Sequence, residues 1–411
     1  MDDNGDKQSS ESVAEFFADF TLGQCDSVSS RDYYFDSYAH REAYEELLKD
    51  NVHTDAYRKA ILFNKHLFEG KRVLVVRSGL GILPYLVAEA GAELVIAQEK
   101  NLIGRYISSI AKSNHYSTIV SALGDITDPE FKLPYGLTEV AVDIIVSEPM
   151  GYTLLHESRI KEVLVARDRF LKPGGKMFPN KFTMNVCALA APEEYSTRKR
   201  FWEDMWGFDF TNPCLGLAMA NPIIMLASEI GQEKPASGEH WQKSELTSEP
   251  AEVFAVDLLT APVDITGRPD MLCGEFTLSA LSQEEASDPE WLREDFHDEY
   301  SMARQAARVD GLVLWFDVKF DHGHVPVEYS TGPEASSTCW AQTILRLPPT
   351  LGTDAGGVLE SSPAAVIVPG EHLYGRIAFR QSNPHRRDLD IKVSMEDGRG
   401  GNAVNAFYTL Q

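Results

Sequence analysis

The stretch VLVVRSGLGIL, residues 73–83, decides how this chain begins to fold. Its four leading apolar residues predict a buried strand, and the glycines after them suit a tight turn into a helix. In doubly wound folds, this first strand–helix turn lies where a nucleotide-type ligand binds. Gly79 and Gly81 therefore predict such a site, although Arg77 stands where the loop ordinarily carries its first glycine.

Strands and helices alternate on both sides of this turn. The apolar pattern first predicts two short helices within residues 31–71. It then predicts strands over residues 72–76, 93–99 and 142–148. Helices are predicted over residues 83–91, 101–113 and 157–171. The Pro-Gly-Gly at 173–175 is expected to end the last helix. This rhythm is typical of a parallel sheet with helices on both faces.

After Phe178-Pro179 the pattern changes to short strands separated by turn residues, which predicts an antiparallel β-barrel or sandwich. Two excursions interrupt it, an aromatic-rich helical segment at 193–210 and an acidic insertion at 282–305. We therefore expect three parts: a disordered acidic tail over residues 1–30, an α/β domain over 31–178 and a β domain over 179–411.

Composition narrows the cellular setting of the chain. Five scattered cysteines without a CxxC pair predict neither a zinc site nor disulfides, so we expect no metal and a reducing compartment. The polar N-terminus resembles no targeting signal, and no long apolar run predicts a membrane span. The expected location is the cytoplasm, with the nucleus as an alternative.

The net charge of −24 argues against direct binding of nucleic acid. It favours basic partners such as Arg- or Lys-rich peptides, or it serves solubility alone. Both interpretations of the charge stay open at this point.

A second loop carries paired carboxylates. The segment SEPMGYTLLHE, residues 147–157, follows a predicted strand and places Glu148 and Glu157 on either side of a Gly-Tyr turn. Two carboxylates on one loop are suited to clamp a planar guanidinium through bidentate hydrogen bonds. Glu99 ends the second predicted strand, where an acidic residue ordinarily binds a ribose hydroxyl.

With this loop in view, most of the chain resembles the protein arginine methyltransferases. SE-x-MGY-x-LL-x-E is similar to the double-glutamate loop of that family, and YYFDSY (33–38) to its cofactor-lid helix. FWEDMWGFDF (201–210) resembles the dimerisation arm and TCWAQTILRL (338–347) the Thr-His-Trp loop. The order of these motifs looks most like the type I, asymmetric-dimethylating branch.

The resemblance implies a Rossmann-like S-adenosylmethionine domain followed by a β-barrel with an inserted arm at about 192–222. It implies that Glu148 and Glu157 position a substrate arginine, with Tyr34, Phe35, Tyr38, Gly79, Gly81 and Glu99 on the cofactor side. It also implies ring dimers in which the arm docks on the partner's methyl-donor domain. The arm aromatics expected at that interface are Phe201, Trp202, Trp206, Phe208 and Phe210.

The chain departs from the family pattern on the cofactor side. Val75 and Arg77 replace the Asp-x-Gly of the first motif, and His53 replaces an arginine that pairs with the cofactor's carboxylate. Tyr44 and Cys339 each replace a histidine. Two lost charged contacts, each worth roughly 1.5–3 kcal/mol, together with an intruding arginine, would weaken cofactor binding about a thousandfold.

These departures leave three functions to separate. The first is an impaired, prozyme-type subunit that binds S-adenosylmethionine weakly or not at all and supports an active paralogue in a heterodimer or heterotetramer. The second is an active type I arginine methyltransferase with an unusual pocket. The third is a non-enzymatic scaffold for arginine-rich proteins. Arg/Gly-rich proteins, including RNA-binding proteins, are the expected substrates or ligands.

Overall fold

The computed structural model describes most of the α/β domain and the larger part of the β domain. The described residues are 45, 47–80, 82–138, 140–190, 201–210, 222–225, 227–228, 241–242, 245–267, 272–281, 307–347, 350–353, 359–362, 364–367, 370–381, 389–397 and 404–410. The predicted tail, the acidic insertion and the residues Tyr34, Phe35, Tyr38, Tyr44 and Gly81 lie outside them.

A five-stranded parallel sheet in the order β3-β2-β1-β4-β5 forms the α/β domain. Its strands are β1 (Arg72–Val76), β2 (Leu94–Glu99), β3 (Ile119–Leu123), β4 (Val142–Ser147) and β5 (Leu171–Phe178). Residues 73–76 of the central strand are fully buried between its neighbours, which explains why this strand is apolar on both faces. The predicted Rossmann-like arrangement is confirmed, although the Pro-Gly-Gly at 173–175 lies inside β5 rather than closing a helix.

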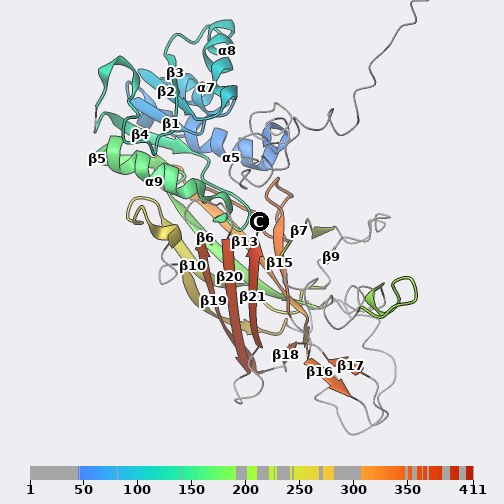
Figure 1. The fold of residues 1–411 in the computed structure, drawn as a ribbon. Helices are drawn as coiled ribbons and strands as arrows, with labels where there is room; N and C mark the ends of the chain where they lie inside the picture. The colour runs from blue at the N-terminus through green and yellow to red at the C-terminus, as the bar shows by residue number, and fades with distance from the viewer. Residues whose placement is uncertain are drawn as a thin grey trace, which may run out of the picture.

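Helices cover this sheet, as Figure 1 shows. They are α5 (Asn51–Leu62), α6 (Lys65–Phe68), α7 (Ile82–Glu89), the 3-10 turn η1 (Leu102–Tyr106), α8 (Ile107–Ser113) and α9 (Arg159–Phe170). Asp50 caps α5 through a bond from the His53 N–H to its carboxylate at 3.0 Å. Short 3-10 turns, η2 (Pro134–Gly136) and η3 (His156–Ser158), lie in the loops.

The remaining strands are mostly antiparallel and occupy the other end of the molecule (Figure 1). One sheet follows the order β10-β6-β13-β15-β7 with β14 paired to β13, and a second follows β11-β19-β20-β21. The first contains β6 (Lys181–Leu189), β7 (Ile223–Met225), β10 (Ala251–Asp257), β13 (Gly311–Phe320), β14 (Val327–Ser330) and β15 (Gln342–Arg346). The second contains β11 (Cys273–Ser279), β19 (His372–Gln381), β20 (Leu389–Asp397) and β21 (Val404–Leu410).

Three two-stranded pairs complete the described strands: β8 (Ala227–Ser228) with β9 (Trp241–Gln242), β12 (Ala307–Val309) with β18 (Ala365–Ile367), and β16 (Thr350–Thr353) with β17 (Leu359–Ser362). The antiparallel β domain is thus confirmed. Over the described residues, however, its strands form separate sheets and do not close into the expected barrel.

Polar contacts join the two domains. The Asn64 amide, just after α5, donates to the Val325 carbonyl at 2.9 Å and accepts from the Val325 N–H at 2.9 Å. Arg167 on α9 donates to the carbonyls of Leu258 and Ala261, each at 2.6 Å. Because these bonds are short and bidentate, they fix the β domain against the parallel sheet. Within the described part of the chain, no helix is long and apolar enough to cross a membrane.

Candidate functional site

Arg77 follows β1 at the carboxyl edge of the sheet and adopts a left-handed backbone with φ of 61°. A non-glycine residue in this conformation costs roughly 1–2 kcal/mol relative to glycine. Its side chain is 6% exposed and therefore points into the protein rather than to solvent. The arginine is therefore an inward-facing cation at the predicted nucleotide loop.

Two carboxylates face the Arg77 guanidinium. Its Nη1 lies 3.5 Å from Oε1 of Glu99, and its Nε lies 3.3 Å from Oε2 of Glu162 on α9. Glu99 is fully buried, and the Glu162 side chain is 7% exposed. A buried guanidinium with carboxylates on two sides is electrostatically compensated, which explains how the loop tolerates it.

Glu99 also accepts hydrogen bonds from backbone donors. The N–H of Gly79 donates to Oε2 at 2.9 Å, while the N–H groups of Lys100 and Asn101 donate to Oε1 at 2.7 and 2.9 Å. An ionised carboxylate offers about four acceptor positions. With Arg77, three of these four contacts are to Oε1 and one is to Oε2, so a ribose hydroxyl would have to share this carboxylate with groups of the chain itself.

Val75 contributes no polar group here, because it is buried within β1 between Ala97 and Val146. Gly79 has a positive φ of 54°, as expected of a glycine in this turn. Among the described residues of this region, Arg77 and Gly79 thus both contact Glu99.

The double-glutamate loop follows β4 and closes on itself. The Gly151 N–H donates to the Leu154 carbonyl at 3.1 Å, and the His156 N–H donates to the Tyr152 carbonyl at 3.0 Å. A Cβ at Gly151 would lie 2.2 Å from the His156 carbonyl oxygen, so only glycine fits at that position. These contacts keep the loop that carries Glu148 and Glu157 compact after β4.

Each loop glutamate lies against a basic side chain of the same chain. Nε2 of His53 is 3.0 Å from Oε1 of Glu148, and Nε of Arg159 is 2.8 Å from Oε2 of Glu157. All four residues are buried. His53 therefore contacts Glu148 of the double-glutamate loop, although the resemblance implied that this position acts on the cofactor side.

The loop at 338–340 packs against the same region, as the resemblance implied. The Cys339 N–H donates to Oδ2 of Asp50 at 2.9 Å, and Nε1 of Trp340 donates to the Met150 carbonyl at 3.4 Å. The Tyr57 hydroxyl on α5 donates to the Ser147 carbonyl at 2.6 Å. Backbone and aromatic contacts thus tie α5 to the glutamate loop without the family's histidine.

The Cys339 side chain reaches solvent, yet surrounding protein atoms desolvate much of it. This desolvation, followed by the negative charges of Asp50 and Glu148, raises the pKa of the Cys339 thiol far above its usual range, while the charge of Arg159 lowers it. The thiol is therefore neutral at physiological pH and is a poor nucleophile.

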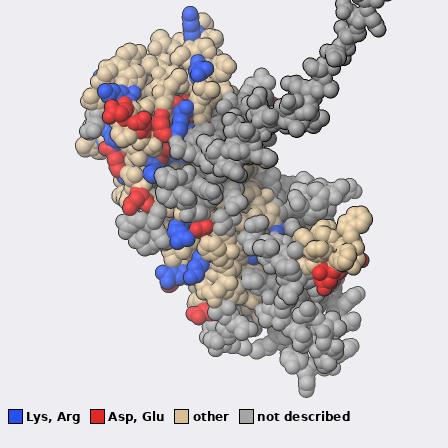
Figure 2. Space-filling model, in the orientation of Figure 1, with Lys and Arg blue, Asp and Glu red and all other residues tan. Residues whose placement is uncertain are grey.

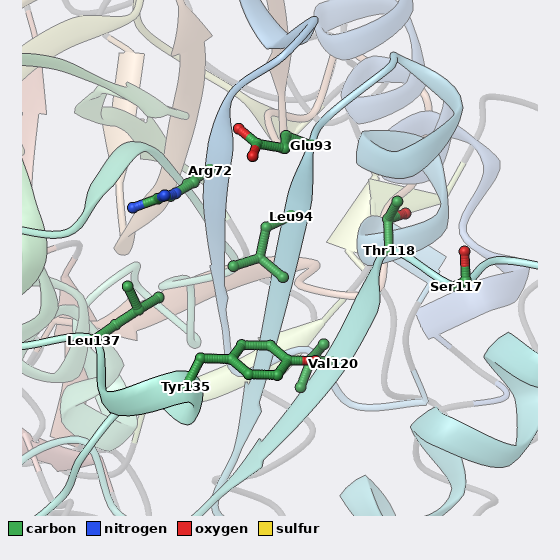
Figure 3. Close-up of a pocket in the computed structure, with 8 residues that line it drawn as sticks. All are labelled: Arg72, Glu93, Leu94, Ser117, Thr118, Val120, Tyr135 and Leu137. Atoms are coloured by element: carbon green, nitrogen blue, oxygen red, sulfur yellow. The ribbon is translucent and has the colours of Figure 1, made fainter.

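A separate pocket of about 480 Å³ lies at the opposite edge of the sheet (Figure 3). It is lined by Arg72 and Leu94, which begin β1 and β2, and by Thr118, which precedes β3. In Figure 3 the Tyr135 ring lies across it in front of Val120. Because ligands of such sheets bind at the carboxyl ends of the strands, this pocket is not the predicted cofactor site.

The described part of the arm, residues 201–210, exposes aromatic side chains. Trp206 is 94% exposed at a turn where it and Gly207 have positive φ angles of 58° and 83°. Phe201 and Phe208 are 58% and 68% exposed, Phe210 is also exposed, and Trp202 is half-buried. In Figure 2 this segment stands out at the right of the molecule, beside a red acidic patch. Four of these five aromatic side chains are thus exposed on the described segment.

Sequence reasoning missed three residues at this site: Asp50, Arg159 and Glu162. Asp50 joins α5 to the 338–340 loop, while Arg159 and Glu162 pair with Glu157 and Arg77. The available signal was the sequence SRIKE, residues 158–162, which directly follows the second glutamate. It places the opposite charges of Arg159 and Glu162 one helical turn apart.

The fold is that of a two-domain protein. The carboxyl ends of its parallel strands lie where a nucleotide-type ligand is predicted to bind, and two buried glutamates lie in the loop after β4. A sequence model described as the arginine methyltransferase oligomerization subdomain matches residues 182–397. Protein arginine N-methyltransferase 8-B of Danio rerio is 33% identical over 374 residues, covering 90% of this chain and 74% of that protein. The chain belongs to the protein arginine N-methyltransferase family.

Two further similarities agree with this assignment. Protein arginine N-methyltransferase 1 of Caenorhabditis elegans is 31% identical over 370 residues, covering 90% of this chain and 89% of that protein. The solved structure of the Trypanosoma brucei PRMT1 enzyme–prozyme heterotetrameric complex with AdoHcy superposes with a TM-score of 0.70 at 27% identity. That comparison covers 91% of this chain and all of the other.

Proposed function

We propose that this chain is a catalytically impaired arginine methyltransferase subunit of the prozyme type. In this proposal it forms a hetero-oligomer with an active paralogue and supports the paralogue's S-adenosylmethionine-dependent methylation of protein arginines. The observation that carries the proposal is the buried Arg77, held between Glu99 and Glu162.

The residues present do not fit the methyl donor. The Arg77 side chain lies buried in the turn after β1, where the methyl donor would bind, and contacts the Glu99 carboxylate. Three backbone N–H groups also donate to that carboxylate, so a ribose hydroxyl would have to compete with them. Restoring the family pattern with Val75→Asp, Arg77→Gly and His53→Arg together is expected to recover cofactor binding.

The exposed aromatic side chains of the arm support a partner subunit. Exposed aromatic side chains of this size are common at protein interfaces and are unfavourable on a monomer surface. The Trypanosoma brucei complex, by its name, joins an enzyme and a prozyme in a heterotetramer. We infer that residues 201–210 of this chain dock on an active paralogue in a similar way.

The experiment uses the chain purified from its own cells together with whatever protein co-purifies. Methylation of an Arg-Gly-rich peptide by the separated partner is measured with and without this chain. We expect the partner's rate to rise at least tenfold when the chain is added, and a Trp206→Ala variant to lose this effect. An unchanged partner rate would contradict the proposal and favour a scaffold.

The alternative of an active enzyme is favoured by one observation, the retention of both loop glutamates in buried positions after β4. The chain alone would then methylate the Arg-Gly-rich peptide. The proposed prozyme subunit would not.

A further inference from the structure

Arg159 begins α9, two residues after the second loop glutamate, and its guanidinium already occupies Glu157. The distance from Nε of Arg159 to Oε2 of Glu157 is 2.8 Å. The two side chains are 10% and 12% exposed, so the pair is largely shielded from water. The attraction between opposite charges in such surroundings is stronger than on an open surface.

The local backbone fixes this pairing. Glu157 adopts a left-handed conformation with φ of 71°, and Thr153 and Leu154 earlier in the loop have φ angles of 53° and 63°. Each such non-glycine residue costs roughly 1–2 kcal/mol, so the loop holds this shape only because its surroundings impose it. The Glu157 carboxylate is therefore held beside the first turn of α9, where Arg159 lies.

Arg159 is also near enough to the loop at 338–340 for its charge to be felt there. Its positive charge acts on the Cys339 thiol, as do the negative charges of Asp50 and Glu148. Cys339 precedes Trp340, whose indole N–H bonds to Met150 inside the glutamate loop. The charges of Arg159, Asp50 and Glu148 thus all act on the same thiol beside the glutamate loop.

We propose that Arg159 is a resident guanidinium that takes the place of the substrate arginine at Glu157. The other loop glutamate, Glu148, lies against His53, so each acceptor carboxylate is already matched by a basic group of the same chain. An arginine of an incoming peptide must displace Arg159, which is tethered beside Glu157 at a high effective concentration. This inference rests on the proposed function, since it takes the glutamate loop as an arginine-binding site.

The test measures binding of a fluorescein-labelled Arg-Gly-rich peptide to the full chain, by anisotropy and without cofactor. Arg159→Ala and the size-conserving Arg159→Met are expected to bind it at least tenfold more tightly than the unaltered chain. Lys161→Ala is the matched control, because it removes an exposed cation from the same helix. That variant should leave the affinity unchanged.

Adding Glu157→Gln to Arg159→Met should return the affinity to that of the unaltered chain, and methylguanidinium should compete with the peptide only in the Arg159 variants. Affinities within twofold of the unaltered chain for both Arg159 variants would overturn the inference. So would an equal gain in Lys161→Ala. Neither result bears on whether the chain methylates alone, so a failure here is distinguishable from a failure of the proposed function.

Discussion

Replacing Arg77 separates the two effects of this residue, backbone strain and charge pairing. Arg77→Ala removes the guanidinium from Glu99 and Glu162 but keeps a non-glycine residue at a φ of 61°. Breaking a buried ion pair from one side costs about 3–5 kcal/mol. Arg77→Gly loses the same contacts but relieves roughly 1–2 kcal/mol of strain. The net loss expected for Arg77→Gly is therefore about 1–4 kcal/mol.

The assay is urea unfolding of the full chain followed by circular dichroism. Arg77→Ala should be less stable than Arg77→Gly by the strain, roughly 1–2 kcal/mol. Glu162→Gln in the Arg77→Gly background should restore part of the loss, with a coupling energy of about 1–3 kcal/mol between the two positions. If Arg77→Ala is as stable as the unaltered chain, the buried pairing described here is refuted.

Three further predictions concern other parts of the chain. Trp206→Ala should weaken subunit association by about 2 kcal/mol or more, roughly 30-fold, as measured by analytical ultracentrifugation; no change would refute the arm's role. Asp50→Ala removes the helix cap and the Cys339 contact and should lower the free energy of unfolding in urea by about 1–2 kcal/mol. Asp50→Asn should have a milder effect. Equal stability would show that the link between α5 and the 338–340 loop is unimportant. Burial lowers the pKa of His322 from its usual 6.5. The unfolded chain therefore binds the proton at a higher pH than the folded chain does. The free energy of unfolding falls as the pH drops from about 6.5 through the folded pKa. His322→Asn should reduce the fall in melting temperature between pH 7.5 and 5. A melting temperature that depends on pH as steeply as in the unaltered chain would count against this prediction.

Local apolar pattern predicted β1, β2 and β4 of the parallel sheet but missed β3 and β5. Residues 72–76 were expected as a strand and form β1 with those bounds, because a fully buried strand needs an unbroken apolar run. The Pro-Gly-Gly at 173–175 misled the prediction, since proline and glycine usually end helices yet here lie within the edge strand β5. Closure of the β domain is decided by distant strand pairing, which a local pattern does not encode.

The sequence named candidate site residues but not the contacts they make. The sequence placed Arg77, Glu99 and the two loop glutamates at one edge of the sheet. It did not indicate that Arg77 pairs with Glu162, because Glu162 lies on a helix far along the chain and meets it only in the folded protein. The pairing of Glu157 with Arg159 depends on a left-handed backbone at Glu157, which residue type does not predict.

The central claim is that the methyl-donor site of this chain is closed by its own Arg77. The most direct measurement is calorimetric titration of the purified full chain with S-adenosylhomocysteine, with the Val75→Asp, Arg77→Gly, His53→Arg variant beside it. We expect no binding to the unaltered chain in the micromolar range and measurable binding to the variant. Micromolar binding to the unaltered chain, with methylation of an Arg-Gly-rich peptide by that chain alone, would contradict the claim.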